Sequence, residues 1–253
     1  MGKKSNSGKT GNPVLEPSPK KDNSPRVLQR EKLKNPVLIR ELNWTEKQKK
    51  FFEIALDKDT RLMFIDGPAG TAKTLLAVYT ALRLLNDKRV SDVVYLRSAV
   101  ESSDAHLGFL PGTTDEKMAA YNAPFWDKVE ELLSFPDKKR LIDDNRVHCL
   151  PINHIRGLNW NAKAVILDEA QNSTQKELVT TLTRLGEFSR CFICADPKQT
   201  DLHVRSGGFQ KICNLLEHNP QAKEFGIHVF RFTHEDIMRS KLVAFLAKEL
   251  EKL

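Results

Sequence analysis

The chain has 253 residues, of which 40 % are hydrophobic and 29 % are charged, a balance typical of a globular protein with a substantial core. Its mean hydropathy is −0.44, it has no apolar run near 18 residues and it starts with a polar segment, so we expect neither a membrane span nor a secretory signal. Four scattered cysteines are too few for a disulfide framework, so the sequence predicts a cytoplasmic protein.

Positive charge is concentrated at the start of the chain. The first 35 residues hold nine Lys or Arg and three Asp or Glu, and so carry +6 of the net charge of +7. They are rich in Ser, Asn, Pro, Gly and Lys and show no periodicity, so we expect residues 1–35 to form a disordered basic tail. Such a tail can hold phosphate backbones by counterion release, or it can simply solubilise the chain. Residues 36–253 are expected to form a single domain.

The elements expected after residue 36 alternate between helix and strand. A helix is expected from Trp44 to Leu56 with Thr45 as its N-cap, followed by a buried strand at 62–65 and a strongly apolar helix at 74–85. The remaining expected elements, in chain order, are a strand at 93–96, a loop at 104–112, a polar helix at 115–134 with an interruption near Pro124, strands at 147–152 and 164–167, a helix at 174–185 closed by Gly186, a strand at 190–194, a helix from 207, a strand at 227–230 and a helix at 235–252.

This order predicts an α/β fold with a mostly parallel sheet and helices on both of its faces. The strands are continuous apolar runs rather than alternating ones, which is typical of strands buried on both sides. Three of them end in polar residues. Ligands of open α/β sheets bind at the carboxyl ends of the strands, so these polar residues are candidates for a site.

The first such candidate is a glycine-containing turn between a strand and a helix. It reads Gly67, Pro68, Ala69, Gly70, Thr71, Ala72, Lys73 and Thr74. The pattern is that of a phosphate-binding loop, whose backbone N–H groups surround phosphates at a helix N-terminus. In that chemistry Lys73 bridges the β- and γ-phosphates and the Thr74 hydroxyl binds Mg²⁺. Ala72 stands where the pattern has its second glycine, so its methyl group either approaches the phosphates or requires a backbone conformation that suits glycine.

The second candidate is a pair of acids at the end of an apolar strand. Asp168 and Glu169 follow the strand at 164–167, and Asp168 lies 94 residues after Thr74. Asp168 is positioned to hold Mg²⁺ through water, and Glu169 to polarise an attacking water molecule. Because an enzyme that transfers phosphate to a small molecule must exclude water, this pair favours hydrolysis.

Two glutamines complete the candidate site, and each has a simpler alternative. Gln199 follows the strand at 190–194 and can contact a γ-phosphate, although the neighbouring Asp-Pro is also an ordinary turn. Gln48, in the helix ahead of the phosphate loop, can read the adenine edge, although it also fits an ordinary surface glutamine. Cys191 and Cys194 lie three apart in a strand and therefore face opposite sides, which favours packing over metal binding.

Together these segments resemble the PhoH family, which is related to the N-terminal motor core of superfamily 1 helicases. The resemblance covers roughly residues 43–245 and rests on GPAGTAKT, LRSAVESSDAHLGFLPGTTDEKM, VILDEAQN, LTRLG, DPKQTDL and VFRFTHEDIMRS. It implies a RecA-like P-loop ATPase fold and assembly into homo-oligomeric rings, often hexamers. Because a helicase closes its ATP site between two such domains and this chain has length for one, an arginine must come from a neighbouring subunit or another partner. The candidates are Arg184, Arg205, Arg231 and Arg239.

The sequence therefore predicts an ATPase that uses ATP and Mg²⁺ and couples hydrolysis to remodelling of RNA or single-stranded DNA. The alternative is an oligomeric module that uses ATP to switch its binding of a protein partner, as in a stress or phosphate-starvation response. A nuclease is less favoured because we find no separate acidic metal cluster, and a small-molecule kinase is the least favoured.

Overall fold

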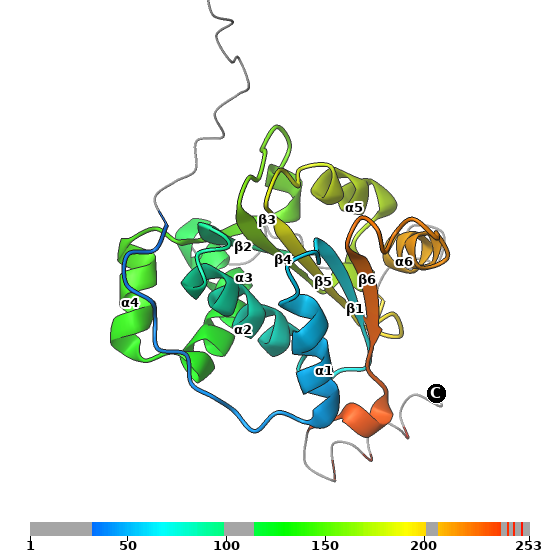
Figure 1. Ribbon diagram of the computed structural model, residues 1–253, viewed down its shortest axis with the longest axis horizontal. Coiled ribbons are helices and arrows are strands. Elements are labelled where there is room, and N and C mark those ends of the chain that lie inside the picture. Colours follow the sequence, from blue (N-terminus) through cyan, green and yellow to red (C-terminus); the bar gives the residue numbers. More distant parts are fainter. Residues whose placement is uncertain are drawn as a thin grey trace, which may run out of the picture.

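The computed structural model describes residues 32–98, 114–200 and 207–238 and the single positions 242, 245 and 249. Residues 1–31 of the expected tail (1–35) and the expected loop at 104–112 lie outside these residues, whereas Leu33 is 2 % exposed and packs into the core. The described part is an α/β fold in which a sheet is layered between helices (Figure 1). No helix among the described residues has the length and apolar character needed to cross a bilayer.

The sheet has six strands in the order β3-β2-β4-β5-β1-β6, and each pairing is parallel. The strands are β1 (Leu62–Asp66), β2 (Asp92–Arg97), β3 (Val147–Pro151), β4 (Lys163–Asp168), β5 (Arg190–Ala195) and β6 (Ile227–Arg231). Because they are parallel, all six carboxyl ends lie at one edge and all six amino ends at the opposite edge. β5 lies between β1 and β4, so the three segments that follow these strands are neighbours.

Helices cover both faces of the sheet, as the sequence predicted. They are α1 (Glu46–Ala55), α2 (Lys73–Asn86), α3 (Thr114–Leu132), α4 (Phe135–Asp143), α5 (Gln175–Leu182) and α6 (Phe209–Glu217). Figure 1 shows α1 to α4 on one side of the sheet and α5 and α6 on the other.

Each strand contributes to two cores, one on each face of the sheet. In β1, Met63 and Ile65 pack into the core under α1 to α4, whereas Leu62 and Phe64 pack into the core under α5 and α6. Both sets of side chains are therefore removed from water, which explains why the strands read as continuous apolar runs. The fold class predicted from these runs is confirmed.

The helices differ from the prediction in four places. The helix expected at 174–185 ends at Leu182, and Gly186 is not its C-cap. The Gly186 N–H instead donates to the Trp160 carbonyl oxygen at 2.6 Å, and a Cβ at Gly186 would lie 2.7 Å from that same oxygen. The glycine is thus required by a close approach of two backbones that are distant in sequence.

The other three differences also result from local or tertiary contacts. α3 continues through Pro124, because Phe125 and Val129 just beyond it are fully buried and hold the helix on the core. α4 was not predicted, and it begins at a Ser134 N-cap with a proline in its first turn. The closing helix does not begin at 235, since 234–236 form a 3₁₀ turn and 237–238 are non-helical; residues 242, 245 and 249 are helical.

Candidate functional site

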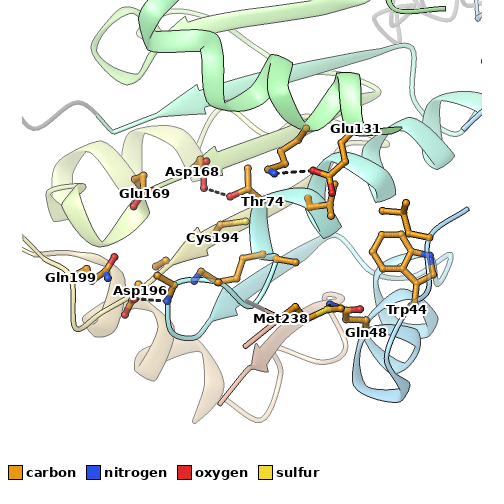
Figure 2. A pocket seen from close by; sticks show the side chains of 18 of the residues that line it. Trp44, Gln48, Thr74, Glu131, Asp168, Glu169, Cys194, Asp196, Gln199 and Met238 are labelled. Carbon is orange, nitrogen blue, oxygen red and sulfur yellow. Dashed lines mark hydrogen bonds and ion pairs between the residues drawn. The ribbon is translucent and has the colours of Figure 1, made fainter. Parts of the chain in front are cut away.

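A cleft of about 430 Å³ lies at the carboxyl edge of the sheet. The phosphate-loop residues form its floor, and the segments that follow β4 and β5 form one wall (Figure 2). Trp44, Gln48 and Met238 line the far end. The structure therefore brings most of the predicted residues into one cavity, whereas Gly67, Pro68 and Thr71 do not line it.

The loop between β1 and α2 is held by backbone contacts to the end of β5. The Gly67 N–H donates to the Ala195 carbonyl at 3.2 Å, and the Ala69 N–H donates to Asp196 Oδ2 at 2.8 Å. The Lys73 ammonium lies over the loop and donates to the carbonyls of Gly67 at 2.6 Å and Pro68 at 2.9 Å. This places a cation where the loop is concave.

Ala72 is the N-cap of α2 and adopts the left-handed conformation, with φ 64° and ψ 22°. This conformation costs an L-residue about 1–2 kcal/mol, whereas glycine adopts it freely. The special backbone conformation expected from the sequence occurs, and Ala72 also lines the cleft. The Ala72 carbonyl still accepts the first helical bond, from Leu76 N at 2.9 Å, so the helix begins normally.

Asp168 and Thr74 meet at the base of the cleft. The Thr74 hydroxyl donates to Asp168 Oδ1 at 2.9 Å, and the Tyr95 hydroxyl donates to Oδ2 at 3.0 Å. Asp168 is only 5 % exposed, and burial first and the neighbouring Glu169 second raise the pKa of its carboxyl group. A buried carboxylate of this kind is better accommodated when a cation compensates its charge. Tyr95 was not predicted from the sequence because it lies inside an apolar strand.

Glu169 follows in the left-handed conformation, with φ 52°, and accepts a hydrogen bond from Gln171 Nε2 at 2.6 Å. Gln171 was not predicted, although it is 4 % exposed and links the segment that follows β4 to the segment that follows β5. Its Oε1 accepts from the Asp196 backbone N–H at 3.1 Å, and its carbonyl accepts from the Thr200 hydroxyl at 3.1 Å. Its position two residues after the predicted acids is the signal that could have found it.

Gln199 lines the cleft on the segment after β5, within reach of this network. Its backbone carbonyl accepts a long bond from Gln171 Nε2 at 3.5 Å, and its side chain is exposed. The structure thus places Gln199 beside the acids, while its contact with a phosphate stays a prediction.

Gln48 is 2 % exposed, so it is not a surface glutamine. Its Oε1 accepts from the Thr45 N–H at 3.0 Å in a capping box, and its Nε2 donates to Met238 Sδ at 2.9 Å. Met238 N in turn donates to the Gly70 carbonyl at 3.0 Å. The first helix is thereby joined to the phosphate loop, and the adenine contact of Gln48 stays a prediction.

The two candidate arginines that the structure describes, Arg184 and Arg231, do not line this cleft. Arg231 is held by its own chain, since its Nη2 bonds Glu217 at 2.7 Å and its Nε lies 3.3 Å from Asp66. Arg184 follows α5 and makes a long bond to the Leu158 carbonyl at 3.5 Å. Arg205 and Arg239 lie outside the described residues.

The cysteine prediction is confirmed in its geometry. Cys191 packs into the core under α5 and α6, whereas Cys194 packs into the opposite core. Burial raises the pKa of the Cys191 thiol to about 12. Within the described ranges, no group of three or more His, Cys, Asp or Glu side chains could hold a metal ion.

Comparison with known proteins decides the family. The chain matches the model of the PhoH family, described as PhoH-like protein, over residues 42–251. It belongs to the PhoH family. It is 35 % identical over 202 residues to the PhoH-like protein of Mycobacterium bovis, which covers 79 % of this chain and 55 % of the relative. Identity to the PhoH-like protein of Bacillus subtilis is also 35 % over 202 residues, covering 79 % and 61 %, respectively. Identity to the protein PhoH of Escherichia coli is 34 % over 184 residues, covering 72 % and 51 %.

This PhoH-like chain thus spans about half to three-fifths of the length of the curated relatives it matches. Among solved structures, the large terminase of a thermophilic bacteriophage aligns with a TM-score of 0.49 at 12 % identity, covering 80 % of this chain and 49 % of that one. The Pif1 helicase of Candida albicans aligns with a TM-score of 0.36 at 17 % identity, covering 76 % and 41 %. The family match and the strand–loop–helix geometry together assign the RecA-like P-loop NTPase fold.

Proposed function

We propose that this PhoH-like chain binds and hydrolyses ATP with Mg²⁺ and couples hydrolysis to remodelling of RNA or single-stranded DNA. The observation that carries the proposal is the contact between Thr74 and Asp168. These residues are 94 positions apart in sequence, yet their side-chain oxygens lie 2.9 Å apart directly beside Lys73 and the phosphate loop. A hydroxyl and a carboxylate are the oxygen ligands that Mg²⁺ prefers next to a phosphate.

In this proposal the residues of the loop hold the triphosphate. The backbone N–H groups at the start of α2 point to the phosphates, and the helix dipole favours their negative charge. The Lys73 ammonium exchanges its bonds to the Gly67 and Pro68 carbonyls for the β- and γ-phosphate oxygens. Thr74 and Asp168 would hold Mg²⁺, which would neutralise the negative charge that develops on the phosphate during hydrolysis.

Glu169 is the group that takes the proton of the attacking water. The Gln171 side chain donates a hydrogen bond to the Glu169 carboxylate and accepts one from the Asp196 backbone N–H. Loss of the γ-phosphate near Glu169 is therefore transmitted through Gln171 to the segment that contains Gln199. This connection is the route by which hydrolysis changes the shape of the surface around the cleft. An arginine from a neighbouring copy in a ring completes the site, since neither Arg184 nor Arg231 lines the cleft of its own chain.

The test is the steady-state ATPase rate of the purified chain with and without single-stranded RNA and DNA. Glu169→Gln is the active-site variant, and Glu187→Gln, an exposed acid away from the cleft, is its matched control. We expect turnover that Glu169→Gln lowers at least about 100-fold and that one of the polynucleotides raises severalfold. Turnover that no polynucleotide changes would reject the remodelling activity and favour a protein-binding switch. Turnover equal in both variants would reject the assigned catalysis.

A further inference from the structure

A second cavity, of about 500 Å³, lies at the amino edge of the sheet, on the side opposite the nucleotide cleft. Loops that precede β1, β2, β4 and β5 form it, because all amino ends of parallel strands meet at this edge. Its lining contains six cationic side chains: Lys32, Lys58, Arg61, Lys88, Arg89 and Arg190. We refer to these six residues as the amino-edge basic pocket.

The positive charge of this pocket is only partly compensated. Asp87 lines the pocket, and Asp57 and Asp59 lie in the same loop as Lys58, which leaves an excess of three positive charges. Within the described part of the chain, Lys58, Arg61 and Lys88 form no ion pair. These three side chains are exposed and can therefore meet an anion from solution.

The two deeper arginines are fixed by carbonyl groups rather than by acids. Arg190 Nη2 donates to the Lys58 carbonyl at 2.6 Å, and Arg89 Nη2 donates to the Asp57 carbonyl at 2.8 Å. Arg190 is 5 % exposed, and its Nε has no hydrogen-bond partner among the described residues. Burial, and then repulsion from Arg61 and Arg89, lower the pKa of Arg190 to about 10. A bound anion would relieve both the repulsion and the missing bond.

Backbone strain is concentrated in the same place. Lys88, Ala162 and Phe188 line the pocket and have positive φ values of 57°, 52° and 60°. Such conformations cost free energy and gather at functional sites, as Ala72 and Glu169 do in the nucleotide cleft.

We propose that the amino-edge basic pocket binds the phosphodiester backbone of a single-stranded nucleic acid. The cations come from the segment at Lys32, from the loops that precede β1 and β2 and from the first residue of β5, so they form a track for several phosphates rather than a cage for one. The inference rests on the proposed function and deepens it, since it names the surface that holds the strand, but it requires no hydrolysis of ATP.

The experiment is fluorescence anisotropy of labelled oligo(U) and oligo(dT), each about 20 nucleotides long so that they span the track, with the full chain. It is run without ATP, from about 0.05 to about 0.5 M salt, a range over which phosphate contacts weaken steeply. The test variant is Lys58→Gln/Arg61→Gln/Lys88→Asn, in which Asn is chosen because it tolerates the positive φ of Lys88. The control variant, Lys50→Gln/Lys139→Gln/Lys176→Gln, removes the same charge from exposed lysines elsewhere. Circular dichroism melting and binding of a fluorescent ATP analogue show that both variants are folded.

Each phosphate contact contributes about 0.7 to the salt slope for a single strand, so losing three should lower the slope by about 2. If the wild type and the variant bind equally at about 1 M salt, this smaller slope means that the variant binds about 100-fold more weakly than the wild type at about 0.1 M salt. The control should keep the wild-type slope. Equal losses in both variants would show a net-charge effect and overturn the proposal, as would an unchanged slope in the test variant. Binding of pyrophosphate but of neither strand would also overturn it, and none of these outcomes depends on the ATPase rate.

Discussion

Gln171→Ala is expected to destabilise the fold and to disconnect Glu169 from the segment after β5. The Gln171 amide accepts from the Asp196 N–H and donates to the Glu169 carboxylate. A buried amide N–H without a partner costs about 1–3 kcal/mol, and a hydrogen bond to a partly exposed charged group adds about 1 kcal/mol. The sum is about 3 kcal/mol, which for a chain of this size lowers the melting temperature by about 9 °C.

Gln171→Glu provides a sharper test because it keeps the shape and changes only the charge. The new carboxyl group lies next to Glu169, and both repulsion and burial raise its pKa in the folded state. The pKa of a Glu side chain in the unfolded state is about 4.3. Because the pKa in the folded state is higher, the new carboxyl group lowers the stability of the fold as the pH rises above that value. Gln171→Glu should therefore approach wild-type stability near about pH 5 and fall furthest below it at about pH 8.

The assay is urea unfolding of both variants at about pH 5 and about pH 8, on either side of the expected titration. Gln175→Ala is the control, since Gln175 is exposed on α5. We expect the control to stay within about 0.5 kcal/mol of the wild type. If Gln171→Ala lost less than about 1 kcal/mol, or if the deficit of Gln171→Glu did not grow with pH, the amide would not bridge Glu169 and Asp196 as described.

Three further predictions concern single side chains. Asp168→Asn removes a carboxyl group whose pKa is raised by burial, so this carboxyl group lowers the stability of the wild type as the pH rises. The melting temperature of Asp168→Asn minus that of the wild type, measured by differential scanning fluorimetry, should therefore increase from about pH 4 to about pH 8. A difference that stays constant with pH would contradict this. Gly226→Ala should cost about 3 kcal/mol in urea unfolding, because φ is 68° and the new Cβ would lie 1.9 Å from the Asp59 carbonyl oxygen; a neutral result would refute that contact. Thr45→Ala should cost about 1 kcal/mol in the same assay by breaking the capping box of α1, whereas Thr45→Ser should retain most of that stability.

Local sequence patterns were sufficient for the strands, for most of the helices and for part of the site. The apolar runs are strands because nearly every side chain in them is buried on one face or the other. Thr45 begins α1 because its side chain caps the first turn, a bond between residues only three apart. Likewise, the phosphate loop is recognisable because its glycines, Lys73 and Thr74 are contiguous.

What only the tertiary structure decided is the set of contacts between segments far apart in sequence. The insertion of β5 between β1 and β4 brings Asp196 next to both the phosphate loop and Gln171, and no periodicity encodes strand order. Packing of Phe125 likewise overrides the local preference of Pro124, and the close approach at Trp160 explains Gly186. The amino-edge basic pocket was also invisible, because its cations come from separate loops that meet only when the parallel strands align their amino ends. Sequence determines the short-range bonds, whereas long-range pairing of strands determines which side chains share a cavity.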